Sequence, residues 1–269
     1  MAYPPLGDML AALRETTPLV HCMTNYVAMN STANLLLATG ASPAMLHAPE
    51  EVTEFTALAG ALSINIGTLS TPWAESMQLA ARTANASQTP WVLDPVAVGA
   101  TAFRQQVCQA LLPHWPSVIR ANASEVMALT GLAGQGRGVD ATASTDDAAQ
   151  AAISLAQRQH CIVAMTGETD FLTDGTHHFR LTGGHPLMPR VTTLGCGLSA
   201  LVAGFVAANR EHPLTATLAA LACFSIAGHR AGQRADGPGS FQVALLDALY
   251  QLTPDDLSSL SQVEALHAV

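Results

Sequence analysis

Short apolar stretches alternate with longer helical patterns along most of the chain. The stretches have the length of buried strands, and the helical patterns fill the gaps between them. Val27–Thr39 is expected to be a helix that follows Asn25 as a cap and stops at Gly40, and Pro72 starts another that ends before Asn85. The expected strands are Leu19–Cys22, Ala44–His47, Leu62–Ile66, Trp91–Leu93, Ser117–Arg120 and Ile162–Met165.

Strands that are apolar on both faces and alternate with helices are typical of a parallel sheet covered on both sides. The pattern therefore predicts an α/β fold, with a doubly wound, mostly parallel central sheet and helices on both faces.

The pattern changes after Met165. Asp170–Thr173 and His177–Leu181 flank a turn at Asp174-Gly175, and Met188–Val191 follows, which together predict an antiparallel edge. The remaining apolar segments predict helices, broken by Gly237-Pro238-Gly239. These segments are Leu198–Ala208, Leu214–Arg234 and Phe241–Leu252.

Composition narrows the class of protein. The chain has 269 residues, of which 49% are hydrophobic and 12% charged, enough apolar material for one domain over residues 1–269 with a large core. A net charge of −9, with only 11 Lys and Arg residues, argues against nucleic acid as a partner. The low charged fraction predicts apolar surface buried between subunits, and therefore a homo-oligomer.

The compartment is expected to be the cytoplasm. The first 13 residues lack the pattern of a signal peptide, and the five cysteines are spread along the chain without a Cys-x-x-Cys pair. Leu198–Ala208 is too short to cross a bilayer, so we expect a buried helix there and no membrane partner.

Candidate chemistry lies where the expected strands end, because open α/β sheets bind ligands beyond the carboxyl ends of their strands. Asn122 and Glu125 are three residues apart at the start of a helix, and Asp94 ends the preceding strand. The spacing fits a capping box, and it also fits carboxylate and amide groups around a Mg²⁺-bound phosphate. Both interpretations can hold together.

Arg120 and Thr166 end two further strands. Arg120 is expected either to clamp a nucleotide phosphate or to be solvated, and Thr166-Gly167 either contacts a ligand or forms a tight turn. Met45, after Ser42-Pro43, would contact a sulfur heterocycle or fill the core.

The loop Val191–Leu198 opens directly into an apolar helix. Its backbone N–H groups at the helix N-terminus would form an anion hole for a transferring phosphoryl group, and Gly195 permits close approach. Cys196 would take the proton of an acceptor alcohol, hold that alcohol by a hydrogen bond, or be a small apolar helix residue.

Five separated motifs can be compared with known families. They are Leu19–Asn25, Gly40–Met45, Leu93–Ala100, Ile119–Glu125 without Ala121, and Gly136–Asp140. Together they resemble the hydroxyethylthiazole kinase family of the ribokinase-like superfamily, and the resemblance runs through almost the whole chain.

The resemblance implies ATP-dependent phosphorylation of the primary alcohol of 4-methyl-5-(2-hydroxyethyl)thiazole in thiamine salvage. It also implies homotrimers with active sites at subunit boundaries, and a catalytic Cys196 where related vitamin kinases place an aspartate. The roles that it implies are acceptor binding by Met45, Gly195 and Asn25, ATP binding by Arg120 and Thr166, Mg²⁺ binding through water by Asp94 and Glu125, and support by Asn122.

One motif departs from the family pattern Gly-Thr-Gly-Cys-Ala. This chain has Thr193 and Leu194 in place of the first glycine and the threonine, and Gly197 in place of the alanine. Ala121 likewise replaces a usual glycine. The alternatives are therefore a kinase for another heterocyclic alcohol, such as hydroxymethylpyrimidine, or an ATP-dependent dehydratase or nucleotide-binding regulator on the same fold.

Overall fold

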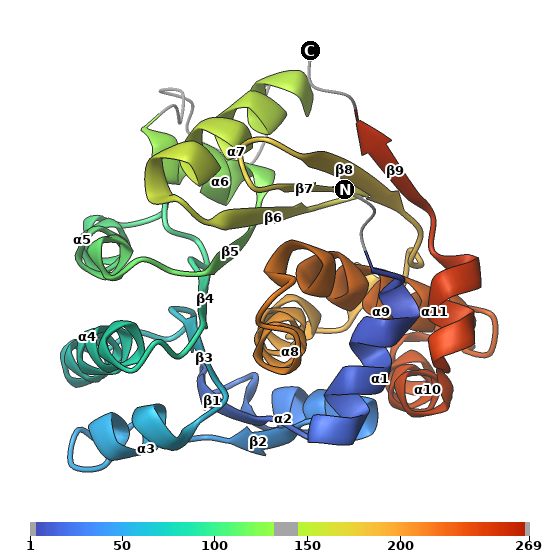
Figure 1. Ribbon diagram of the computed structural model, residues 1–269, viewed down its shortest axis with the longest axis horizontal. Coiled ribbons are helices and arrows are strands. Elements are labelled where there is room, and N and C mark those ends of the chain that lie inside the picture. The colour runs from blue at the N-terminus through green and yellow to red at the C-terminus, as the bar shows by residue number, and fades with distance from the viewer. Residues whose placement is uncertain (1–3, 132–144, 267–269) are drawn as a thin grey trace.

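A single curved sheet organises the part of the chain that the computed structural model describes, residues 4–131 and 145–266. Six parallel strands are continued by three antiparallel strands, in the order β2-β1-β3-β4-β5-β6-β7-β8-β9 (Figure 1). The motif Gly136–Asp140 lies outside the described residues. The strands are β1 Leu19–Met23, β2 Ser42–Ala44, β3 Ala61–Asn65, β4 Trp91–Asp94, β5 Val118–Asn122, β6 Ile162–Thr166, β7 Thr169–Thr173, β8 His178–Thr182 and β9 Val263–Leu266.

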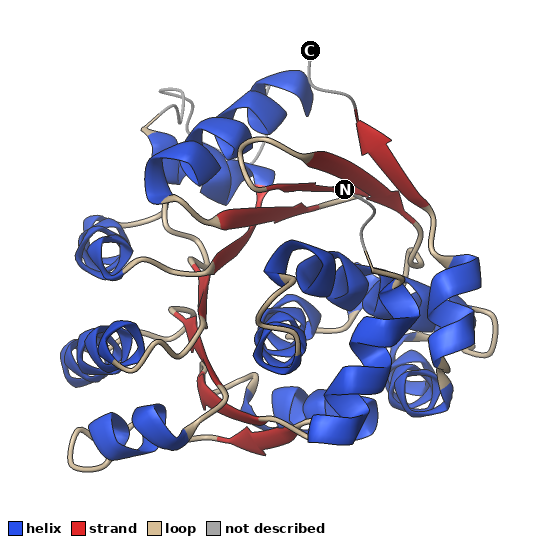
Figure 2. Cartoon of the chain, viewed as in Figure 1, coloured by secondary structure: helices blue, strands red, loops and turns tan. Residues whose placement is uncertain are grey.

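Helices cover both faces of this sheet (Figure 2). α3 to α7 pack on the convex face, and the sheet curls around α8 and its neighbours on the concave face (Figure 1). The helices are α1 Leu6–Thr16, α2 Met29–Thr39, α3 Val52–Leu58, α4 Thr71–Ala86, α5 Ala102–Leu111, α6 Ala123–Thr130, α7 Thr145–Gln159, α8 Leu194–Ala208, α9 Pro213–Gly232, α10 Pro238–Gln251 and α11 Pro254–Leu260, with short 3₁₀ helices η1 Leu112–His114 and η2 Met188–Arg190.

Strand residues alternate between two apolar cores. In β4, Val92 joins the core on the α8 side, whereas Trp91 and Leu93 join the core under α4 and α5. Because both faces are buried, the strand is apolar throughout, and this produced the short apolar stretches in the sequence. The predicted doubly wound, mostly parallel fold with helices on both faces is confirmed.

Local signals place the helices that flank the carboxyl edge. α2 ends at Gly40, whose φ of 118° favours glycine, as predicted. Asn25 does not cap α2: its side-chain oxygen accepts from the backbone of Val27 and Ala28 in a turn that precedes the helix. The predicted helix starting near Pro72 is α4, which the Ser70 side chain caps.

The predicted antiparallel edge contains one error. β7 and β8 form the expected hairpin, but Met188–Val191 is not a strand, because Met188–Arg190 is a 3₁₀ helix. Pro189 lacks the N–H that a strand ladder needs. The place beside β8 is taken by β9, which pairs Phe179 with Ala265.

The second strand is also shifted from its expected position. β2 is Ser42–Ala44 rather than Ala44–His47, and it pairs with β1 alone, with Pro43 opposite Val20. An edge strand tolerates proline, because one side of its backbone has no partner strand. Met45 and His47 therefore lie in the loop that follows β2 at the carboxyl edge.

α8 and α9 form the centre of the concave layer. The helices predicted from Leu198–Ala208 and Leu214–Arg234 are confirmed, with α8 beginning earlier, at Leu194. Among the described residues, α9 is the one helix with the length and apolar composition to cross a membrane. Since 83% of its most apolar window is buried within the structure, it packs as a core helix.

Candidate active site

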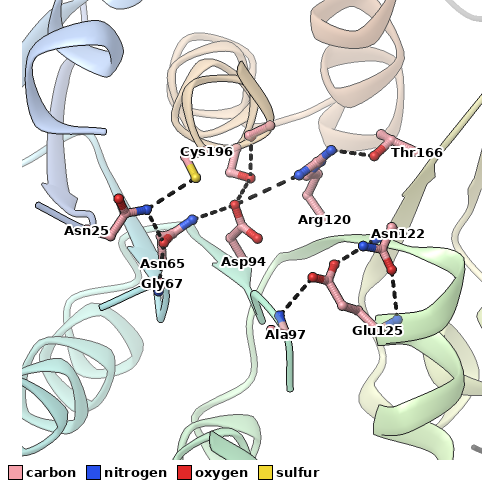
Figure 3. A network of polar contacts seen from close by, with 12 residues as sticks. Asn25, Asn65, Gly67, Asp94, Ala97, Arg120, Asn122, Glu125, Thr166 and Cys196 are labelled. Carbon is pink, nitrogen blue, oxygen red and sulfur yellow. Dashed lines mark hydrogen bonds and ion pairs between the residues drawn. The ribbon is translucent and has the colours of Figure 1, made fainter. Parts of the chain in front are cut away.

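Polar side chains from neighbouring strands meet at the carboxyl edge of the sheet (Figure 3). β4 ends at Asp94, β5 carries Arg120, β6 ends at Thr166, and Asn25 follows β1. The first turn of α8 brings Gly195 beside Arg120 and Cys196 beside Asn25. Parallel strands bring their carboxyl ends to one edge, so residues far apart in the sequence become neighbours.

Asp94 lies at the centre of this group and is only 1% exposed. Its Oδ2 accepts hydrogen bonds from Asn65 Nδ2 at 2.7 Å and from the Ser199 hydroxyl at 2.8 Å. Its buried Oδ1 has no hydrogen-bond partner among the described residues. Burial raises the pKa of Asp94 to about 6, opposed by the nearby Arg120 charge and these hydrogen bonds. The carboxyl group thus keeps one oxygen available to a ligand.

Arg120 lies between Asp94 and the end of β6. Its Nη1 is 3.9 Å from Asp94 Oδ2, and its Nη2 donates a hydrogen bond to the Thr166 hydroxyl. A Cβ atom added at Gly195 would stand 2.7 Å from Nη1, so only glycine lets the guanidinium approach α8 this closely. The sequence placed these residues at one edge, and the structure brings them into contact.

Cys196 is joined to the network from the opposite side. Asn25 Nδ2 donates a hydrogen bond to Cys196 Sγ at 3.2 Å and another to Asn65 Oδ1 at 2.9 Å. Burial and the negative charge of Asp94 raise the pKa of the Cys196 thiol, while hydrogen bonds from Asn25 and Asn65 oppose this shift. Cys196 is partly exposed, whereas Cys22, Cys108, Cys161 and Cys223 are buried.

Asn122 and Glu125 form a capping box at the start of α6, as one of the two interpretations predicted. Glu125 Oε2 accepts from the Asn122 backbone, and Oε1 accepts from the Ala97 backbone, each at 2.9 Å. Ala97 has a φ of 54°, so Glu125 also holds a strained residue of the loop after Asp94. The carboxylate thereby fixes the loop that follows β4.

Three residues of this site carried no strong signal in the sequence. Asn65 and Ser199 are each at most 1% exposed and both donate to Asp94. Arg104, on α5, donates from its guanidinium to the carbonyls of Ile66, Gly67 and Val96, all at 2.7 Å. The sequence places Asn65 at the ligand edge, where it ends an apolar strand, but position alone assigns it no role.

An aromatic cluster borders the site on the side of Asn25. The ring of His47 stacks on Trp73 at 4.0 Å, and Tyr26 lies 4.5 Å from Trp73. The Tyr26 backbone N–H bonds to Thr68 in the loop after β3. Met45, expected here, is partly buried and packs against the apolar core of the concave side. None of these side chains joins the hydrogen-bonded network in the described residues.

The carboxylates fit a hydrated cation better than a cage of direct ligands. Among the described residues, no three His, Cys, Asp or Glu side chains are grouped to hold a metal ion. The unpartnered Oδ1 of Asp94 can accept from a metal-bound water, and each Glu125 oxygen keeps a second lone pair. Mg²⁺ characteristically binds through one or two carboxylates, waters and substrate phosphates.

Comparison with known proteins identifies the family. The sequence model described as "Hydroxyethylthiazole kinase family" matches residues 10–255. The chain belongs to the hydroxyethylthiazole kinase family. A relative named hydroxyethylthiazole kinase from Rhizobium rhizogenes (strain K84 / ATCC BAA-868) is 54% identical over 260 residues, covering 97% of each chain. Another so named, from Roseobacter denitrificans (strain ATCC 33942 / OCh 114), is 54% identical over 253 residues, 94% of this chain and 98% of the relative.

Solved structures agree with the family and with its fold. The hydroxyethylthiazole kinase protein from Pyrococcus horikoshii OT3 has a TM-score of 0.90 at 41% identity, over 97% of this chain and 99% of that one. The pyridoxal kinase from Staphylococcus aureus in complex with pyridoxal has a TM-score of 0.65 at 18% identity, over 92% and 97%. The latter likeness shows the ribokinase-like fold alone.

The departure from the hydroxyethylthiazole kinase pattern has a structural counterpart at Thr193. This residue has a φ of 72°, a left-handed conformation that costs an L-residue roughly 1–2 kcal/mol and that glycine adopts freely. Its hydroxyl lies 2.5 Å from that of Ser31 on α2, which helps to hold it in place. α8 then begins at Leu194. The chain thus keeps the backbone turn that glycine would favour, with a residue that is strained there.

Proposed function

We propose that this protein transfers the γ-phosphoryl group of ATP to the primary alcohol of 4-methyl-5-(2-hydroxyethyl)thiazole. The observation that carries the proposal is the buried network joining Cys196 on α8 to Asp94 on β4, at the edge where the fold binds ligands. The identity of 54% to relatives named hydroxyethylthiazole kinase over nearly the whole chain supports this acceptor.

The residues on the two sides of Asp94 would receive the two substrates. Arg120 and Thr166, which are hydrogen bonded to each other, would bind ATP, because a guanidinium matches the charge and geometry of phosphate. Asn25, Met45 and Gly195 would contact the acceptor. The N-terminal turn of α8 directs backbone N–H groups without helical partners toward this space, where they would stabilise charge on the transferring phosphoryl group.

Asp94 and Glu125 would hold Mg²⁺ through water, with Asn122 orienting Glu125. When bound, the ion would neutralise phosphate charge during transfer. Asp94 offers its unpartnered Oδ1, whereas both Glu125 oxygens already accept one backbone N–H each. The capping role and the proposed metal role of Glu125 are therefore compatible.

Cys196 would stand beside the acceptor hydroxyl. As thiolate it would take the hydroxyl proton as the alcohol oxygen bonds to the γ-phosphorus and the bond to ADP breaks. Because burial raises the pKa of Cys196, only a minor thiolate fraction exists at neutral pH. Most of the rate would then come from orientation and electrostatic stabilisation.

The aromatic cluster supports an acceptor with a flat ring. Trp73, His47 and Tyr26 lie around the loops that carry Asn25 and Met45, and a heteroaromatic ring stacks favourably on such side chains. Burial lowers the pKa of His47, so its ring is neutral and presents an uncharged surface.

The assembly and compartment belong to the same proposal. Tyr26 and Val27 are 64% and 61% exposed beside Asn25, which supports a homotrimer in which another subunit covers this side of the active site. The two apolar cores share one sheet, which supports one domain over residues 1–269. We place the enzyme in the cytoplasm. Light scattering on purified protein tests the trimer, and a monomeric mass would contradict it.

The decisive experiment measures ADP release with Mg²⁺ and ATP. Hydroxyethylthiazole is compared with hydroxymethylpyrimidine and with no acceptor. We expect ADP formation that depends on the thiazole alcohol. Formation with the pyrimidine alone would assign the other acceptor and direct attention to the loop at Thr193 and Leu194, and no ADP with any alcohol would favour a nucleotide-binding regulator.

A further inference from the structure

Asn65 connects the two functional ends of the network but has no assigned role. It ends β3, is 1% exposed, and lies between Asn25 and Asp94 (Figure 3). The side-chain amide of Asn65 fits its surroundings in two orientations, because its oxygen and its nitrogen occupy nearly the same space. The surrounding backbone removes that ambiguity.

A backbone N–H can only donate, so it identifies the oxygen of the amide that faces it. The Gly67 N–H points at Asn65 Oδ1 at 2.9 Å, which leaves Asn65 Nδ2 to donate to Asp94 Oδ2 at 2.7 Å. The orientation of Asn65 is therefore fixed from both ends, by a donor on one side and a carboxylate on the other.

The same logic fixes Asn25. The backbone N–H groups of Val27 and Ala28 point at its Oδ1 at 3.1 and 3.0 Å, so its Nδ2 must face Asn65 Oδ1 and Cys196 Sγ. The donor and the acceptor are therefore assigned for each of these side-chain hydrogen bonds between Cys196 and Asp94. Asn25 donates to Asn65, Asn65 donates to Asp94, and the Cys196 sulfur accepts from Asn25.

The direction of these bonds constrains Cys196. A thiol whose sulfur accepts from Asn25 cannot direct its own hydrogen at Asn25, so that hydrogen must point elsewhere. An N–H donor also stabilises sulfur more when the sulfur is negatively charged. The Val27 and Ala28 N–H groups set which end of the Asn25 amide faces the sulfur, and Asn65 sets the angle at which the amide nitrogen does so, because it accepts a hydrogen bond from that same nitrogen.

We propose that Asn65 is a positioning residue that, by holding the Asn25 amide, keeps the Cys196 sulfur in the accepting and more reactive state. The proposal rests on the proposed kinase function for its catalytic consequence alone. Charged groups act on the same sulfur, with Asp94 on β4 lowering its reactivity and Arg120 on β5 raising it. Asn65 acts on the sulfur in two ways, by holding Asn25 and by its own side-chain hydrogen bond, which lowers the pKa of Cys196 as the Asn25 bond does.

The test measures the reactivity of Cys196 without any substrate. Wild type and Asn65→Leu are treated with iodoacetamide at fixed alkaline pH, and modification of each cysteine is followed by peptide mass spectrometry. We expect alkylation of Cys196 to slow about tenfold, since a hydrogen bond to a charged group contributes roughly one pKa unit. The four buried cysteines serve as an internal measure of unfolding.

The matched control is Ser63→Ala, which changes a buried polar residue of the same strand two positions away. It should alkylate at the wild-type rate. Asn65→Leu should also lower kcat about tenfold or more while the KM for ATP changes less than about twofold. If Asn65→Leu exposes the buried cysteines, Asn65→Ser replaces it, with the same direction of change.

Alkylation of Cys196 within twofold of wild type in a folded Asn65 variant would overturn the proposal. The outcome is separate from that of the proposed function, because iodoacetamide needs neither ATP nor an alcohol. If the wild-type protein forms no ADP, the kinase assignment is rejected. The alkylation result would still test the effect of Asn65 on Cys196.

Discussion

The two edges of the parallel sheet differ in how they treat polar groups. At the carboxyl edge, Asp94 and Asn65 are each 1% exposed and hydrogen bonded into one network. At the amino edge, a cavity of about 560 Å³ is lined by side chains such as Trp115, His160 and Arg210, and Trp115 is 52% exposed. The described cavity thus lies at the amino edge, and the buried hydrogen-bonded network lies at the carboxyl edge.

The cavity at the amino edge is lined by residues at the junctions between helices and strands. Trp115 and His160 directly follow helices and Gln88 lies two residues beyond the end of α4, and all three have left-handed backbones where the chain leaves a helix before the next strand. The shape of the amino edge thus results from chain connections. Burying the Asp94 carboxylate raises the free energy of the folded state. Proteins commonly retain such a cost in stability at functional sites.

The largest expected contrast between the edges comes from removing a carboxylate at each. Asp94→Asn should lower kcat by about 100-fold or more, because it removes a charge from the proposed Mg²⁺ and phosphate site. Asp174→Asn, at the amino edge, should change kcat less than about twofold. Steady-state ADP release measures both. Equal losses in the two variants would remove the distinction between the edges.

Asp94→Asn should also alter the pH dependence of stability. The folded pKa of about 6 lies above the usual 3.8, so the group stabilises the fold at low pH, and this contribution is lost as pH rises from about 4 to 6. The amide has no such loss. Relative to wild type, the variant should gain up to about 3 kcal/mol in free energy of unfolding between pH 4 and 7, measured by denaturant titration. A pH-independent difference would contradict a raised pKa.

A smaller effect should separate the two roles of Glu125. Glu125→Ala removes the acceptor of the Asn122 and Ala97 N–H groups, which should cost about 1–2 kcal/mol in free energy of unfolding. If Glu125 also holds the cation, Mg²⁺-dependent kcat should fall about 100-fold, which corresponds to about 2.7 kcal/mol and exceeds the loss in free energy of unfolding. Unfolding and kcat are measured on the same preparation. If the loss in kcat, expressed as a free energy, equals the loss in free energy of unfolding, Glu125 has the capping role only.

The smallest expected effect compares two tryptophans. Trp73→Leu should raise the KM for the thiazole alcohol about fivefold and leave the KM for ATP unchanged, because an aromatic contact contributes roughly 1 kcal/mol. Trp115→Leu, at the amino edge, provides the matched control and should change neither constant. If the KM for the alcohol is the same in both variants, the aromatic cluster has no part in acceptor binding.

Much of this arrangement could be predicted from the sequence, because parallel strands end at one edge. Arg120 and Thr166 were placed together from the apolar stretches alone, and the capping box of Asn122 and Glu125 was predicted from spacing. β9 could not be predicted, since a short strand more than 80 residues from its partner leaves no local pattern. The sequence predicts Met188–Val191 at this antiparallel edge, where β9 pairs with β8 instead.

The polar network was harder to foresee than the fold. The contact of Asn65 with Asp94 depends on the register of β3 against β4, which pairs these two residues directly. No spacing in the sequence encodes that register. The contact of Asn25 with Cys196 likewise depends on the packing of α8 against the sheet, which follows from many apolar contacts together.

The apolar helix α9 also bears on how the chain reaches this structure during synthesis. It packs between α8, which precedes it, and α10, which is made last of the three. Until α10 leaves the ribosome, the nascent polypeptide carries a long apolar helix with part of its surface uncovered. Exposed apolar surface in an incomplete chain promotes aggregation and recruits chaperones. The interval between the emergence of α9 and that of α10 from the ribosome is therefore one in which the growing chain carries uncovered apolar surface.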